Sequence, residues 1–138
     1  MVGIVECYVS LWVGCSESDE KLLDYISIDY EEDEDGDDDS QFMKDFGIDY
    51  LDEDFMERIF RDEKTDSIKN LLSRCSDEDK VIPEFEKIFV SGKKFNCGIL
   101  VYDMNYDGNI NFIENKYCRL EFIGTVKINI KKEIENYG

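Results

Sequence analysis

The stretch DMNYDGNINFIE, Asp103 to Glu114, carries oxygen-bearing side chains at a spacing that could bind calcium. Asp103, Asn105 and Asp107 occupy positions 1, 3 and 5 of the loop pattern. A glycine follows at position 6, and Glu114 closes the loop at position 12. Carboxylate and amide oxygens are the ligands that calcium prefers. One interpretation of the chain is therefore a calcium- or cation-binding acidic protein that uses the 103–114 loop.

The neighbours of this stretch favour a different structure. The preceding residues, CGILVY, are β-branched and aromatic, so they predict a strand where a calcium loop needs a helix. Tyr106 places a bulky ring where such loops usually hold small or polar residues. Asp107-Gly108 lies between CGILVY and NINFIE, and such a dipeptide between two β-type runs indicates a two-residue hairpin turn. We therefore expect a β-hairpin here and no bound metal.

Catalytic chemistry has few candidates in this sequence. The chain contains no histidine, which excludes Ser-His and Cys-His nucleophile pairs. No glycine-rich phosphate loop follows a predicted strand. Paired carboxylates could bind magnesium or transfer protons, but a chain with 34 acidic residues contains such pairs by chance. We expect no enzyme and no cofactor, with a carboxylate-based, metal-dependent enzyme as a further alternative.

The net charge of −18 is unevenly distributed. Residues 1–79 hold 26 acidic against 7 basic residues, whereas residues 80–138 are nearly balanced. Such a surface repels nucleic acid and anionic membranes and attracts cationic partners. The run DYEEDEDGDDDS can bury nothing and repels itself, so we expect a mobile acidic loop over residues 29–40.

The cysteines and the apolar runs bear on the compartment. The cysteine count is odd, no pair has zinc-ligand spacing, and no histidine could complete a zinc site, which indicates reduced thiols. No positively charged leader precedes the first apolar run, and no run reaches the roughly 18–20 residues that span a bilayer. We expect a cytoplasmic protein without membrane contact, in an oligomeric state that the sequence leaves open.

Periodicity predicts the elements that must position any site. Alternating apolar residues over 3–13 predict a strand with one fully buried face, which leaves Trp12 on the less buried face, and Ser16 can cap the following helix. Further elements are a helix capped by Ser40, a strand near Phe55–Phe60, a helix from about Thr65, a helix from near Pro83, and strands from Asn96 onward. In the last strand one face is expected to hold Leu120, Phe122, Val126, Ile128 and Ile130.

These elements predict an α+β fold, in which one largely antiparallel sheet carries helices packed on one face. The last three predicted strands follow one another closely, so we expect them to form a C-terminal three-stranded meander. The length fits a single domain over residues 1–138 with one buried core.

The segment FMKDFGIDYLDEDF, residues 42–55, interleaves aromatic and acidic residues. In one interpretation the apolar set is core and the acids are its solvated side. In the other, exposed tyrosine and leucine side chains lie among carboxylates and bind a basic protein. Aromatic residues supply much of the energy in such interfaces, and acids supply association rate and specificity.

Three motifs carry a family resemblance. VSLWVG at 9–14, FMKDFGIDYLDEDF at 42–55 and FIGTV at 122–126, in this order, resemble the bacterial immunity protein 22 family. The resemblance implies an antidote, encoded beside a polymorphic toxin, that binds the toxin domain in the producing cell and blocks it. It carries over no catalytic or metal-binding residues, because such proteins act by occlusion. Many toxins of this kind are nucleases with basic clefts, where carboxylates could replace phosphates.

The sequence therefore predicts an immunity protein that neutralises a cognate, basic toxin domain by occluding its active site, with a nuclease as one candidate target. We expect direct contacts from Asp49, Tyr50, Asp52, Glu53, Asp54 and Glu57. We expect electrostatic steering from Asp35, Asp37, Asp38 and Asp39.

Overall fold

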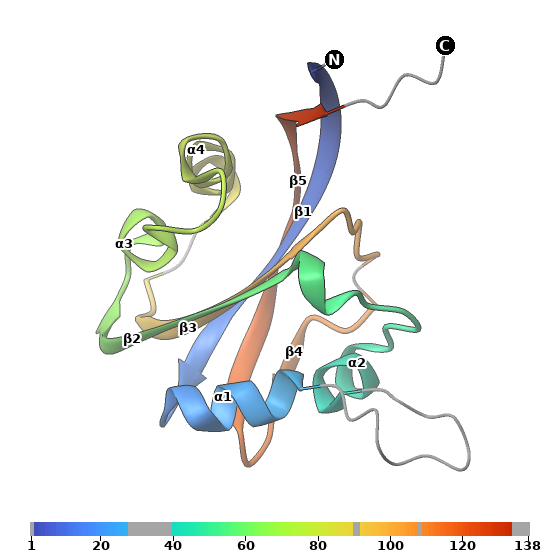
Figure 1. Cartoon of the computed structure of the whole chain (residues 1–138). Helices are drawn as coiled ribbons and strands as arrows, with labels where there is room; N and C mark the ends of the chain where they lie inside the picture. Colours follow the sequence, from blue (N-terminus) through green and yellow to red (C-terminus); the bar gives the residue numbers. More distant parts are fainter. Residues whose placement is uncertain (1, 28–39, 90–91, 108, 134–138) are drawn as a thin grey trace.

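A computed structural model of the chain describes residues 2–27, 40–89, 92–107 and 109–133 (Figure 1). Its centre is a five-stranded sheet in the order β2-β3-β1-β5-β4, with antiparallel neighbours. Within these residues four short α-helices flank the sheet, so the predicted α+β class and antiparallel sheet are confirmed. The elements are β1 (Val2–Ser16), α1 (Asp19–Ile26), α2 (Gln41–Phe46), the 3₁₀ helix η1 (Glu53–Phe55), β2 (Met56–Thr65), α3 (Ile68–Leu72), α4 (Glu78–Ile88), β3 (Phe95–Tyr102), β4 (Phe112–Glu114) and β5 (Cys118–Glu133).

Helices cover both faces of the sheet, whereas the sequence predicted them on one face. α3 and α4 lie on the face that includes Leu11, and α1 and α2 lie on the face that includes Trp12 (Figure 1). Trp12 is 0% exposed, so the face of β1 expected to be less buried is also core. The continuous run CGILVY carries the signal for this arrangement, because a strand buried on both faces needs no polar alternation.

The C-terminal strands do not form the predicted three-stranded meander. β4 pairs with β5, but β3 pairs with β1 and β2, and β1 lies between β3 and β5. The predicted hairpin through Asp107-Gly108 is therefore also wrong, because β3 and β4 are not neighbours in the sheet. Local residue preferences identified strands here correctly. They could not show that β3 and β5 would each pair with β1, which lies between them.

A bulge divides β5 between the two faces of the sheet. Leu11 pairs with Gly124 and Trp12 pairs with Phe122, so β5 holds one extra residue at Ile123. Gly124 has a φ of 153°, a conformation that favours glycine. One inserted residue reverses the side-chain alternation, so the predicted single face was wrong. The five residues split, with Leu120 and Phe122 on the Trp12 face and Val126, Ile128 and Ile130 on the Leu11 face.

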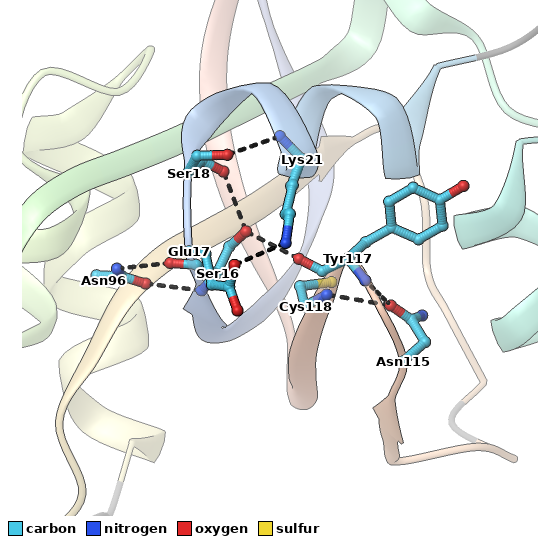
Figure 2. A network of polar contacts seen from close by, with 8 residues as sticks. All are labelled: Ser16, Glu17, Ser18, Lys21, Asn96, Asn115, Tyr117 and Cys118. Atoms are coloured by element: carbon cyan, nitrogen blue, oxygen red, sulfur yellow. Dashed lines mark hydrogen bonds and ion pairs between the residues drawn. The ribbon is translucent and has the colours of Figure 1, made fainter.

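A polar network closes the end of β1 and starts α1 (Figure 2). The Asn96 side chain accepts a hydrogen bond from the Ser16 N–H (3.0 Å) and donates one to the Ser16 carbonyl (2.9 Å). The Ser16 hydroxyl lies 2.9 Å from the Tyr117 carbonyl oxygen, so it is not available to cap the helix as predicted. Ser18 caps α1 instead, and its Oγ accepts from the Lys21 N–H at 3.1 Å.

The remaining helices and β2 follow the sequence more closely. Ser40 caps α2 as predicted, accepting from the Met43 N–H at 3.2 Å. β2 and α3 lie where a strand and a helix were expected. α4 begins at Glu78, earlier than predicted, and Pro83 lies inside the helix rather than in its first turn. Pro83 is exposed, so water can satisfy the carbonyl that loses its helical partner.

Candidate functional site

The segment between α2 and β2 turns its acidic and aromatic side chains outward from a buried base. Gly47 ends α2 with a φ of 66°, which glycine adopts without a Cβ penalty. Ile48 and Leu51 are buried and join the core beneath α2. Tyr50 lies between them in the chain and is 76% exposed. Of the two side chains expected to be exposed for a partner, Tyr50 therefore is, and Leu51 is core.

The acids of this segment differ in how tightly they are fixed. Asp52 is half-buried, and its Oδ1 accepts from the Asp54 N–H at 2.9 Å, which starts η1. Asp49 and Asp54 are exposed. Phe55 ends the turn with 47% of its side chain exposed. The segment thus presents carboxylates beside two accessible aromatic rings.

Glu57 ties β2 to the loop between α3 and α4. Its Oε1 accepts from the Ser76 N–H at 2.9 Å, and the Tyr102 hydroxyl donates to the Ser76 carbonyl at 2.8 Å. Burial, and secondly the hydrogen bond with Glu57, raises the pKa of Tyr102. Burial, and secondly the Glu57 charge, raises the pKa of the Cys75 thiol to about 11. Glu57 is therefore a structural acceptor as well as a surface charge.

These residues border a groove with a volume of about 460 Å³. It lies between residues 54–57, the α3–α4 loop, the end of β3 and residues 5–7 of β1. Val5, Cys7 and Ile130 supply an apolar floor beside the Tyr102 ring. No lysine or arginine among the described residues lines the groove. We call it the acidic groove after the five acidic residues among those that line it, which are Glu6, Asp54, Glu57, Asp77 and Asp103.

Four of these acidic side chains have no basic partner within the part of the chain that the structure describes. Glu6 lies 3.8 Å from the Lys127 ammonium, whereas in the described chain no ion pair joins a base to any of the other four, Asp54, Glu57, Asp77 and Asp103. Asp77 and Asp103 also have positive φ values of 55° and 61°. Aspartate tolerates this left-handed conformation better than most residues, although it costs free energy. The groove is therefore a region of concentrated, uncompensated negative charge.

The structure brings most of the predicted contact residues to this groove or beside it. Asp54 and Glu57 line it, while Tyr50 and Asp52 line an adjoining hollow of about 130 Å³. Glu53 is exposed on the same segment, as is Asp49. The predicted steering residues lie outside the described residues, as does the predicted mobile loop except for Ser40: they are Asp35, Asp37, Asp38 and Asp39.

Sequence reasoning missed three of the groove's carboxylates. Glu6 and Asp77 are not among the predicted contact residues. Asp103 was noticed, but as the first ligand of a calcium pattern. No sequence signal connects these positions, because they come together only through the pairing of β1 with β3 and the packing of the α3–α4 loop.

The 103–114 segment is fastened to the core by Tyr106. This ring is buried, lies 5.3 Å from the Trp12 ring, and its hydroxyl contacts the Phe46 carbonyl at 3.0 Å. β3 precedes the segment and β4 forms its last three residues, so the helix–loop–helix setting of such a calcium loop does not occur here. Among the described residues, no three acidic or cysteine side chains are close enough to share a metal ion.

A comparison with known families identifies the chain. The sequence model of the family named immunity protein 22 matches residues 9–129. The chain belongs to the immunity protein 22 family. No curated protein and no solved structure matches it. Membership implies neutralisation of a cognate toxin, and immunity proteins are generally non-enzymatic.

Family membership implies that this immunity protein binds a toxin, but it does not say which residues form the binding surface. The matched residues include seven of the eleven residues that line the groove, and those outside the match are Val5, Glu6, Cys7 and Ile130. Among the described helices of this immunity protein, none has the length and apolar character needed to cross a bilayer. The acidic groove and the exposed aromatic rings of Tyr50 and Phe55 are features that suit binding to another protein.

Proposed function

We propose that this immunity protein neutralises its toxin by placing the acidic groove and the adjoining segment 49–57 over a positively charged active site. The observation that carries the proposal is the lining of the groove, which within the described residues includes five acidic residues and no lysine or arginine. Opposite charges across an interface raise the association rate and select the partner. The target is a basic protein, and a nuclease fits because its cleft binds phosphates.

Two exposed rings supply the apolar part of this contact. Tyr50 and Phe55 flank the hollow beside the groove and expose 76% and 47% of their side chains. Large aromatic side chains at the centre of an interface supply most of its free energy, and the surrounding acids exclude wrong partners. Asp49, Asp52 and Glu53 would then form the rim of the same interface.

The first test measures binding and inhibition with the toxin domain encoded beside this protein. We expect a stoichiometric complex in which the toxin loses its activity in the cytoplasm of the producing cell. Phe55→Ala should weaken binding by at least about tenfold, since truncated aromatic hot spots cost about 2 kcal/mol or more. Phe112→Ala is the matched control, because Phe112 is 53% exposed but lies on β4, away from the groove. Equal losses in both variants would refute this interface.

The second test addresses steering by the acidic run. Replacement of Asp37, Asp38 and Asp39 by asparagine should slow association with the toxin and reduce its dependence on salt. Dissociation should change little, because charges outside the contact act on the encounter rather than on the bound state. Stopped-flow rates between about 50 and 500 mM salt measure both effects. Association rates that do not respond to ionic strength would exclude steering.

A further inference from the structure

β1 has an open edge beside the acidic groove. Residues 9–14 of β1 pair with β3 on one side and β5 on the other. Among the described residues, residues 2–7 pair with β5 alone, because β3 ends at Tyr102 opposite Val9. The ribbon of β1 and β5 therefore continues beyond the rest of the sheet (Figure 1). An unpaired strand edge is a template for another strand.

The backbone of Glu6 faces this open edge. The Asp103 N–H donates to the Tyr8 carbonyl at 2.7 Å, so the polar backbone groups of Tyr8 point toward the β3 side. Alternate residues of a strand direct their N–H and C=O groups to the same side. The N–H and C=O of Glu6 consequently point toward the position that β3 has left, and within the described residues they form no ladder there.

At Asp103 the chain turns away from the Glu6 edge of β1, and the acidic groove occupies the space beside that edge. Its φ of 61° ends the extended conformation of β3 directly after Tyr102. The vacated space is the acidic groove, which runs along residues 5–7 of β1 and is walled by residues 54–57 and by Asp77. An extended segment placed there would continue the line of β3 and would lie among the carboxylates.

The charge of the groove selects the occupant. Five acidic residues and no base line it within the described chain, so an incoming strand must carry lysine or arginine to be attracted. A second copy of this chain fits poorly, because pairing two such edges would bring the Glu6 side chains and their acidic neighbours together. Charge complementarity thus favours a basic segment of another protein.

We infer that the toxin inserts an extended, lysine- or arginine-bearing segment into the acidic groove, where it adds as a strand to the open edge of β1. The inference rests on the proposed function, since it describes how the same surface holds the toxin. The backbone of Glu6 supplies hydrogen bonds to the added strand. The carboxylates of Asp54, Asp77 and Asp103 pair with its basic side chains.

The test compares Glu6→Pro with Glu6→Ala in the full chain, using the toxin domain encoded beside it. Both variants lose the carboxylate, but only proline lacks the N–H that faces the open edge. The pairing with β5 is retained because this N–H points away from β5. We expect Glu6→Pro to bind about five- to tenfold more weakly than Glu6→Ala, the loss of about one hydrogen bond. Equal affinities would overturn strand addition.

Amide hydrogen exchange of the wild-type protein gives a second readout that needs no variant to fold. The Glu6 amide should exchange at least about tenfold more slowly in the toxin complex than in the free protein. The Val5 amide faces β5 in both states and is the internal control. No change at Glu6 in a neutralised complex overturns the inference but leaves the proposed function standing. Protection of Glu6 in the free protein that rises with concentration would assign the edge to a second copy and also overturn it.

Discussion

The two ends of β1 differ in both hydrogen bonding and charge. From residue 9 to residue 14 the strand has a partner on each side, and Asn96 bonds both backbone groups of Ser16 beyond it (Figure 2). The surface hollow at this end is lined by Lys93, Lys94 and Arg119. From residue 2 to residue 7 the strand has one partner among the described residues, and the neighbouring groove is lined by acids.

This difference shows where the molecule still has binding capacity. At the Ser16 end, side chains and strands of the same chain satisfy the backbone, and bases lie among the acids. At the Glu6 end, an open strand edge and uncompensated negative charge coincide. A partner that brings backbone groups and positive charge can therefore complete the sheet at the Glu6 end, which is the end that the toxin should cover.

The largest effect should come from closing the gap between strands at the Ser16 end. A Cβ on Gly14 would overlap the Arg119 carbonyl oxygen in the neighbouring strand β5. Because backbone atoms cannot move aside cheaply, Gly14→Ala should lower the free energy of unfolding by about 3 kcal/mol or more. Urea unfolding monitored by Trp12 fluorescence measures the change. Gly92→Ala is the control, since nothing lies within 4 Å of the added Cβ. A Gly14→Ala protein as stable as the control would mean that this end is not closely packed.

The next effect concerns the charge of the two ends. Joint replacement of Asp54, Asp77 and Asp103 by asparagine should weaken toxin binding about 100-fold, or about 2.7 kcal/mol. Asparagine tolerates positive φ about as well as aspartate, so the fold should be retained. Titration calorimetry with the toxin domain measures the affinity.

The matched control removes three charges from the opposite end. Glu17, Glu114 and Glu121 border the hollows near Arg119, and their replacement by glutamine changes the net charge by the same amount. We expect this control to bind within about threefold of the wild type. Similar losses in both triple variants would show that only total charge matters, which would refute the proposed groove interface.

The smallest predicted effect concerns the pH dependence of stability. It tests whether water is excluded from the core as well at the Glu6 end of β1 as at the Ser16 end. An exposed thiol ionises near pH 8.5, whereas burial raises the pKa of Cys75 to about 11. Between about pH 8.5 and 11 only the unfolded state releases this proton, so the contribution to stability is full below about pH 8.5 and is lost as the pH rises to 11. Because solvent screening reduces the effect below what the full pKa difference would give, the loss should be about 1–2 kcal/mol, and Cys75→Ala should remove it.

Cys118 at the other end offers the comparison. Burial, and secondly the Asp45 charge, raises its pKa to about 12, so its share of the loss should extend to higher pH. Urea unfolding of wild type, Cys75→Ala and Cys118→Ala at several pH values separates the two. If Cys75→Ala leaves the alkaline loss unchanged, water reaches this thiol and the groove end is less closed than the structure indicates.

Much of the secondary structure was predictable, because capping residues and apolar periodicity in the sequence agree with the packing in the folded protein. Ser40 provides both the cap and the position of α2, and the apolar alternation of β1 survives because one face meets α3 and α4. The start of α4 was misplaced because Pro83 suits a first turn but is also tolerated at an exposed position further along. The bulge at Gly124 was not predicted, because a single inserted residue does not change the amino-acid composition of a strand noticeably.

The candidate site was predictable only where its residues are adjacent in the chain. The segment 42–55 drew attention because aromatic and acidic residues alternate within a few positions. Glu6, Asp77 and Asp103 are far apart in the sequence, and each resembles an ordinary surface acid. The calcium pattern suggested a metal ligand at Asp103, because the spacing of oxygen-bearing residues can be seen in the sequence. That β-strands adjoin this segment and that Tyr106 is buried are seen only in the structure.

The sequence by itself determined the excess of negative charge, the absence of histidine chemistry and the apolar periodicity of the long strands, since these depend on residue identity and short spacing. Only the tertiary structure decided which strand lies in the middle of the sheet and which edge stays open. Pairing in a sheet joins residues that are distant in the chain, and its energy depends on every competing partner at once. The acidic groove exists because β3 leaves β1 at Asp103, and no local pattern in the sequence encodes that departure.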